Sequence, residues 1–237
     1  SPLVRASAAE ALDGYLTPES VPALLKATRD DYRLVRVRAA GALAAISPGD
    51  LAPENRESLA KAMEEFEKSL LSRPDDYASH YNMGNLHAER RQYGKAIAEY
   101  ELAMKLSPGI VAPLVNMSLA HSQQGRMDKA EEALRKAIKI ESRSAPAYFN
   151  LGLLLAETNR MQEAEASLRK ALELDPQMAQ AAYNLGVVLL QGGKSEGLDW
   201  CRKAWELLPS EPKYGYTLAF YQAKTGDEET AVATLTS

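Results

Sequence analysis

The sequence predicts an all-α fold in which pairs of antiparallel helices stack on one another in a solenoid. Two observations predict it: asparagine-led triplets recur at a constant interval through much of the chain, and small residues recur in register between them. No segment alternates apolar and polar residues with the period of two that marks a half-buried strand. A chain of 237 residues also exceeds the usual size of a single core, which favours two domains or an elongated array.

The first part of the chain, residues 1–50, holds a shorter internal repeat. Residues 2–12 align with residues 33–43 through a shared Leu-Val-Arg followed by alanines. Between them, residues 19–28 have the apolar spacing of an amphipathic helix, with Pro22 tolerated in its first turn. This pattern resembles the HEAT repeat, whose second helix often carries Val-Arg and alanines. The resemblance implies a short domain of helical repeats over residues 1–50.

A break that contains proline, glycine and aspartate, residues 47–53, separates this segment from a long predicted helix over residues 54–72. Within that helix, Ala62, Phe66 and Leu70 keep the spacing of the second helices described below. We therefore predict that residues 51–76 form an adaptor whose apolar stripe packs on the first complete repeat.

The remaining residues, 77–237, carry a longer repeat. Its triplets begin at Asn82, Asn116, Asn150 and Asn184, so that successive asparagines are 34 residues apart. A small residue, a larger apolar residue and a second alanine follow the first three triplets in register: Ala96, Tyr100 and Ala103; Ala130, Leu134 and Ala137; Ala164, Leu168 and Ala171. Small residues let two helices approach closely, and Gly or Asn permits the tight turn between them.

The interval and the residue pattern resemble the tetratricopeptide repeat, a helix pair of about 34 residues. The resemblance implies a right-handed α-α superhelix with repeats at 77–110, 111–144, 145–178 and 179–211 and a partial repeat at 212–237. The fourth repeat is one residue shorter in its second helix, where Gly197, Cys201 and Ala204 take the three packing positions.

In tetratricopeptide arrays the first helix of each repeat lines the concave face, so the resemblance indicates which side chains a ligand meets. From the fifth, sixth and ninth positions of these helices we predict a peptide-binding groove formed by Tyr81, Asn82, Asn85, Asn116, Phe149, Asn150, Tyr183, Asn184 and Tyr216. A primary amide offers both a donor and an acceptor, so a column of asparagines can pair with the backbone of an extended peptide.

Two other interpretations of these residues stay open. The asparagines can instead bond neighbouring helix backbone or water, and Phe149 and Tyr183 can serve ordinary packing between repeats. The carboxylate clamp of chaperone-binding tetratricopeptide proteins is absent, because the fifth positions hold Tyr81, Val115 and Phe149 in place of basic residues. We therefore expect no affinity for C-terminal tails of the Glu-Glu-Val-Asp type.

Composition excludes several classes of function. The 28 basic and 32 acidic residues are interspersed and give a net charge of −4, without the basic face that nucleic acid or an anionic membrane requires. No apolar run approaches the roughly 20 residues of a membrane span. Cys201 is the only cysteine, and the three histidines neither pair with a nucleophile nor complete a metal set. We predict no catalysis and no cofactor, and a protein or peptide as the ligand.

The order of parts also resembles the C-terminal portion of certain large bacterial multihaem cytochrome c-like proteins. That resemblance implies a structural module of a periplasmic electron-transfer protein, although this chain has no Cys-X-X-Cys-His haem motif. Without it, we expect a cytoplasmic location. The helical pattern already present at Ser1 and Pro2 suggests a piece of a longer protein. At the other end we expect Val232 and Leu235 to be exposed, through truncation, self-association or a missing partner.

Overall fold

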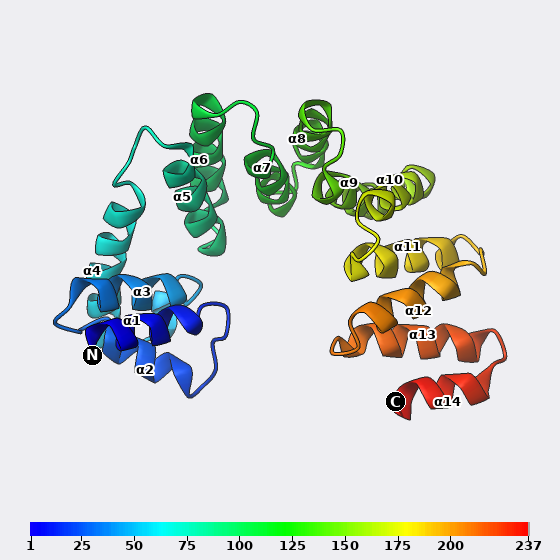
Figure 1. Ribbon diagram of the computed structural model, residues 1–237, viewed down its shortest axis with the longest axis horizontal. Coiled ribbons are helices and arrows are strands. Elements are labelled where there is room, and N and C mark those ends of the chain that lie inside the picture. The colour runs from blue at the N-terminus through cyan, green and yellow to red at the C-terminus, as the bar shows by residue number, and fades with distance from the viewer. Residues whose placement is uncertain (237) are drawn as a thin grey trace. The chain divides into compact units, whose positions relative to one another are not determined.

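The computed structural model describes residues 1–236, and within this range it contains fourteen α-helices, one short 3-10 helix and no β strand. The elements, labelled in Figure 1, are α1 (Pro2–Ala11), α2 (Ser20–Ala27), α3 (Arg33–Ala42), η1 (Pro48–Asp50), α4 (Pro53–Leu70), α5 (Tyr77–Glu89), α6 (Tyr93–Leu106), α7 (Ala112–Gln123), α8 (Met127–Ile140), α9 (Ala145–Glu157), α10 (Met161–Leu174), α11 (Ala179–Gln191), α12 (Gly197–Leu207), α13 (Pro212–Lys224) and α14 (Glu228–Thr236). The predicted all-α fold is confirmed. The chain forms two compact units, Ser1–Ala120 (unit 1) and His121–Ser237 (unit 2).

Unit 1 begins with three short helices and the long helix α4. Helix α3 is central, because both α1 and α4 pack against it, and its Val35, Ala39 and Ala40 are completely buried. A Cβ added to Gly41 of α3 would lie 3.2 Å from the Phe66 ring of α4, so these two helices also approach closely. Helix α2 lies within the predicted segment 19–28, and α4 lies within two residues of the predicted 54–72. The local apolar spacing was therefore sufficient to locate these helices.

The core around α4 continues into the first helix of the longer repeat. Ala62 and Met63 of α4 are buried in the same cluster as Met83 and Leu86 of α5, and Phe66 packs against this cluster from its edge. The apolar stripe of α4 thus packs mainly on α3, where the Phe66 ring lies against Gly41, and it shares a core with α5, the first helix of the first complete repeat.

The in-register residues of the second helices are all buried. Each of the following is at most 1% exposed: Ala96, Tyr100, Ala103, Ala130, Leu134, Ala137, Ala164, Leu168, Ala171, Cys201 and Ala204. The triplet glycine faces them from the first helix. A Cβ added to Gly152 would lie 2.7 Å from Leu168 Cγ, and one added to Gly186 would lie 2.6 Å from Cys201 Sγ. Both distances are too short for real contacts, so these glycines allow the paired helices to approach.

A different residue makes the turn between paired helices. Asn159, between α9 and α10, has φ 61°, and the next amide, of Arg160, donates to the carbonyl oxygen of Leu155 at 2.8 Å. This is the Schellman arrangement, in which a left-handed residue closes a helix. The turn after α11 has Gly193 at φ 75° and the same type of bond. Gly and Asn therefore serve these two turns, as expected, whereas the equivalent turn after α5 uses Arg91 at φ 57°. The triplet glycines serve helix contact.

Candidate peptide-binding face

The predicted binding residues lie on first helices in both units, and the two sets are described separately. We call them the first-helix face of unit 1 and of unit 2. The first consists of Tyr81, Asn82, Asn85 and Asn116, and the second of Phe149, Asn150, Tyr183, Asn184 and Tyr216. Every one of these side chains is at least partly exposed.

In unit 1, two of the predicted amides bond each other. Asn116 donates from Nδ2 to Asn85 Oδ1 at 2.8 Å and to the Tyr81 hydroxyl oxygen at 3.1 Å. The Tyr100 hydroxyl of α6 donates to the same Asn85 oxygen at 2.9 Å. Tyr100 is almost fully buried, and this burial raises its pKa to about 12. Side chains of α5, α6 and α7 thus form one polar cluster, which already uses much of the hydrogen-bonding capacity of Asn85 and Asn116.

Asn82 is the exposed member of this set, and its amide has no side-chain partner among residues 1–236. Its neighbour Tyr81 is half-buried, with its ring centroid 6.1 Å from that of Tyr100. The first-helix face of unit 1 therefore offers one unused amide beside a preformed polar cluster.

In unit 2, the two amides bond their own helices. Asn150 donates from Nδ2 to the carbonyl oxygen of Pro146 at 2.9 Å, and Asn184 donates to that of Gln180 at 2.7 Å. Each acceptor is one helical turn earlier. The bond fixes the side-chain conformation and leaves Oδ1 and the second N–H of each amide without a partner in the described part of the chain.

The aromatic positions of unit 2 differ in exposure. Phe149 packs against the core cluster of this unit. Tyr183 stacks on Tyr214 of α13, with ring centroids 4.8 Å apart and planes 24° apart, and its hydroxyl lies 3.3 Å from Thr217 Oγ1. Tyr216 has the same repeat position on α13 and is 66% exposed. Packing between first helices thus occupies part of Tyr183, whereas Tyr216 stays open to solvent.

Two further residues of this face did not emerge from the sequence. Tyr214 supplies the ring under Tyr183, and Lys213 places its Nζ 4.7 Å from the centroid of the Tyr183 ring. The available signal was the i, i+3 spacing of Lys213 and Tyr216, which puts both on one side of a helix. The repeat pattern did not indicate this spacing, because it assigns only the fifth, sixth and ninth positions of each first helix to the groove.

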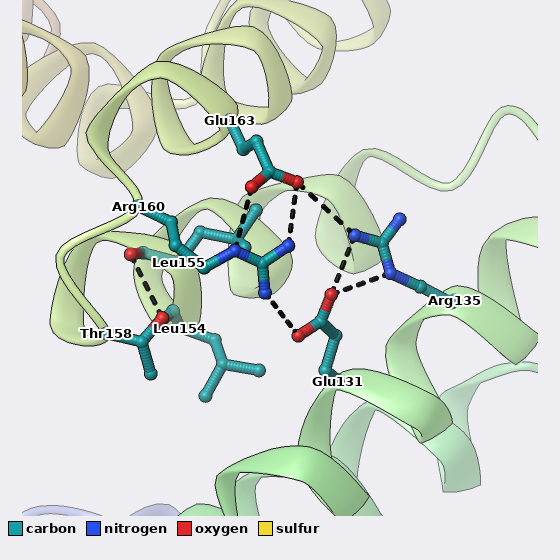
Figure 2. Close-up of polar contacts among 7 residues, drawn as sticks. All are labelled: Glu131, Arg135, Leu154, Leu155, Thr158, Arg160 and Glu163. Atoms are coloured by element: carbon teal, nitrogen blue, oxygen red, sulfur yellow. Dashed lines mark hydrogen bonds and ion pairs between the residues drawn. The ribbon is translucent and has the colours of Figure 1, made fainter.

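On the second helices of unit 2, charged side chains link successive repeats. Figure 2 shows Arg160, in the turn before α10, donating to both oxygens of Glu163 at 2.8 and 2.7 Å and to Glu131 of α8 at 2.6 Å. Arg135 pairs with Glu131 at 2.7 Å. The hydrogen bonds from Arg160 lower the pKa of both carboxyls.

The arrangement recurs 34 residues later. Glu165 pairs with Arg169 at 3.1 Å and with Lys194 at 2.7 Å, and Arg169 also pairs with Glu196 at 2.9 Å. Much of the charge of unit 2 is thus paired along its second helices and turns. By contrast, the only charged residues of its first helices α9, α11 and α13 are Glu157, Lys213 and Lys224.

The described residues contain little that points to catalysis. Cys201 is completely buried, and burial raises the pKa of its thiol to about 11, so it is a packing residue. Among residues 1–236, no group of three or more His, Cys, Asp or Glu side chains is placed to hold a metal ion. None of the helices in that range has both the length and the apolar character needed to cross a membrane.

Comparison with known repeat families agrees with this geometry. Two family models described as tetratricopeptide repeat match the chain, one at residues 77–110 and the other at residues 115–179 and 163–212. The chain contains tetratricopeptide repeats. A model described as HEAT repeats matches residues 1–76, so the tetratricopeptide array follows a HEAT-repeat segment. This repeat content supports a protein–protein interaction scaffold.

Solved structures share the tetratricopeptide fold. A crystal structure of MamA aligns at 23% identity with a TM-score of 0.58, covering 65% of this chain and 90% of that chain. The MamA fragment 41-end from Desulfovibrio magneticus RS-1 aligns at 23% with a TM-score of 0.58, covering 68% and 91%. PilF of Pseudomonas aeruginosa aligns at 22% with a TM-score of 0.62, covering 70% and 77%. At such identities the likeness shows the fold alone.

No curated protein matches the chain. The resemblance to multihaem cytochrome c-like proteins finds no support among the matched repeat families and structures.

Proposed function

We propose that this tetratricopeptide chain is a non-catalytic scaffold that holds an extended segment of another polypeptide on the first-helix face of unit 2. The supporting observation is the pair of half-used amides, Asn150 and Asn184, one repeat apart. Each bonds its own helix through one N–H and keeps an oxygen and a second N–H for a ligand. An extended backbone presents N–H and C=O groups that match such a donor and acceptor.

Hydrogen bonds alone are too weak to hold this segment. Each contributes a net of about 0.5–1.5 kcal/mol, whereas association costs roughly 4–15 kcal/mol of lost rigid-body freedom. Apolar contacts must therefore supply the remainder. Tyr216 is open to solvent, and Tyr183 is partly so. We expect a ligand with apolar side chains that cover these rings, at roughly 25 cal/mol per Å² of apolar surface buried.

In unit 1 we propose a smaller role for the first-helix face. The existing bonds already occupy the oxygen of Asn85 and the N–H groups of Asn116, so only Nδ2 of Asn85 and Oδ1 of Asn116 are left for a ligand in this cluster. Asn82 has no such bond and is the residue there that we propose to contact a ligand, with Tyr81 beside it.

The proposal can be tested by selecting peptides from a random displayed library on the immobilised chain and measuring their Kd. Replacing both Asn150 and Asn184 with alanine should weaken binding about tenfold or more, because up to four hydrogen bonds to the ligand are lost. Circular dichroism should show unchanged helicity.

Asn159→Gly provides the matched control. It removes an exposed amide from a turn at φ 61°, where glycine fits, and should leave Kd unchanged. Equal affinity of the double variant and the natural chain, or failure to select any peptide, would count against the proposal.

A further inference from the structure

Helix α13 carries four exposed side chains along one side. Lys213, Tyr216, Phe220 and Lys224 follow one another at intervals of three, four and four residues, which brings side chains onto one helix face. Tyr216 is 66% exposed and Phe220 is 61% exposed, and both lysines are exposed. We call these four residues the α13 stripe. It consists of two aromatic rings between two cations.

The two cations lie over aromatic rings and not against carboxylates. The Nζ of Lys213 is 4.7 Å from the centroid of the Tyr183 ring, and that of Lys224 is 5.7 Å from the centroid of Tyr221. Neither lysine forms a salt bridge within the described part of the chain. Elsewhere in unit 2, by contrast, cations are paired with glutamates; examples are Arg135, Arg160, Arg169 and Lys194.

The neighbouring first helices add almost no charge to this surface. Helix α13 contains no acidic residue, α11 contains no charged residue, and α9 contains only Glu157. The stripe is therefore an apolar surface with a cation at each end that forms no salt bridge in the described part of the chain, and the nearest acidic residues in sequence, Glu211 and Asp227, lie just outside the two ends of α13. Such a surface favours a partner that brings carboxylates on both sides of apolar side chains.

We propose that the α13 stripe docks an acidic, apolar segment of a partner protein. Its apolar side chains cover Tyr216 and Phe220, and its carboxylates pair with Lys213 and Lys224. This inference rests on the proposed function, because it names the chemistry of the segment that the same face holds. From the helical rise, the two lysines are about 16 Å apart along α13, which an extended chain covers in about five residues.

The probe is a fluorescein-labelled peptide with the core Glu-Phe-Ala-Leu-Ala-Glu, compared with a peptide that has Lys in place of each Glu. We expect the acidic peptide to bind the full chain, more tightly at low than at high salt, and the basic peptide to show no saturable binding. Lys213→Gln combined with Lys224→Gln should weaken the acidic peptide roughly tenfold. Tyr216→Ala combined with Phe220→Ala should weaken it at least as much, because the apolar contact is lost.

Lys203→Gln is the matched control. Lys203 also lies over a ring, with its Nζ 5.2 Å from the centroid of Trp200 on α12, but it is not part of the α13 stripe. This variant should bind the acidic peptide like the natural chain. Because all the replaced side chains are partly or fully exposed, circular dichroism should show the same helicity for every variant.

The outcomes separate this inference from the proposed function. If the affinity for the acidic peptide falls with the asparagine double variant and not with the lysine double variant, the role of Asn150 and Asn184 is supported and the role of the α13 stripe is refuted. If it falls only with the lysine double variant, the stripe stands and the role of Asn150 and Asn184 falls. Equal binding of the acidic and basic peptides, or binding of neither, overturns the inference. The inference is also overturned if the chain forms a concentration-dependent dimer that the lysine double variant abolishes, because a second copy of the chain would then occupy the stripe.

Discussion

Asn116 in unit 1 and Asn184 in unit 2 have the same repeat position, two periods apart, yet their amides bond differently. Asn116 donates to Asn85 and Tyr81, whereas Asn184 donates to the carbonyl oxygen of Gln180 in its own helix. The repeat position therefore determines which helix and which turn carry the amide. It does not determine what the amide bonds.

The cause of this difference lies one repeat earlier. For Asn116, the preceding fifth and ninth positions are Tyr81 and Asn85, and both offer an oxygen. For Asn184, the same positions are Phe149 and Leu153, which have no polar side-chain atom. The amide of Asn184 therefore turns to its own backbone, and half of it stays available. Identical residues at a repeat position acquire different roles through their neighbours.

The largest expected effect comes from removing the centre of the unit 1 cluster. Asn85→Ala takes away the oxygen that accepts from both Tyr100 and Asn116, and the Tyr100 hydroxyl is buried. An unsatisfied buried donor costs about 1–3 kcal/mol. Hydrogen exchange with mass spectrometry should show a corresponding loss of amide protection in α5 and α6.

Two companion variants sharpen that test. Tyr81→Phe removes the other oxygen that Asn116 bonds and leaves Asn85 in place, so it should lose clearly less protection. Adding Tyr100→Phe to Asn85→Ala removes the orphaned hydroxyl and should recover part of the loss. Equal losses for Asn85→Ala and Tyr81→Phe would show that Asn85 is not the centre of the cluster.

The same comparison explains what the sequence could predict. Burial of Ala96, Leu168 and Cys201 followed from the repeat, because the requirement for a small or apolar residue where two helices meet is local. The bonds of Asn116 did not follow, since they need side chains from three helices at once. The contact of Lys213 with Tyr183 likewise depends on two repeats packing together. Repetition in sequence predicts the helices and their contact positions, and the polar chemistry comes from the departures from repetition.

A second, smaller effect is expected in the ion pairs of unit 2. Glu131 bonds both Arg135 and Arg160, and its side chain is 22% exposed. Glu131→Gln should destabilise unit 2 by up to about 1 kcal/mol, the upper range for such surface pairs. The measurement is hydrogen exchange in α8 and α10. The matched control, Glu132→Gln, affects only an exposed pair with Lys129 and should give no measurable change.

The sign of the pH dependence follows from the lowered pKa of Glu131, which Arg160 causes chiefly through its hydrogen bond. A carboxyl with a lowered folded-state pKa contributes its stability above the unfolded value, about 4.3, and loses it as pH falls through the folded pKa. The difference between the natural chain and Glu131→Gln should therefore shrink in acid. A difference that stays constant into acid would mean that the charge of Glu131 contributes nothing.

A third test concerns His80 of unit 1, whose position holds Tyr148 and Ala182 in unit 2. His80 Nδ1 lies 2.7 Å from Glu99 Oε2, and Nε2 lies 3.0 Å from the carbonyl oxygen of Pro74. Both partners accept, so the protonated ring satisfies both, and the bond to Glu99 is the main cause of its raised pKa.

Stability from a raised histidine pKa is fully present below the unfolded value, about 6.5, and is lost as pH rises through the folded pKa. The protection of the α5 amides against hydrogen exchange, corrected for intrinsic exchange rates, should therefore fall as pH rises from about 6.5 through the folded pKa of His80. His80→Gln should flatten the dependence, while α11 in unit 2 should show none of it. A pH dependence that persists in His80→Gln would assign it to another group.

The smallest expected effect is that of Asn184→Ala on stability. The amide bonds a carbonyl of its own helix, and alanine has the higher helix propensity, so loss and gain nearly cancel within about 0.5 kcal/mol. Hydrogen exchange in α11 should be unchanged, whereas Asn116→Ala, the matched variant in unit 1, should lose protection around its cluster. A loss for Asn184→Ala as large as that for Asn85→Ala would mean that this amide supports the fold and has little to offer a ligand. Unchanged stability combined with weakened peptide binding would instead separate an asparagine that serves binding from one that serves packing, although both have the same place in the repeat.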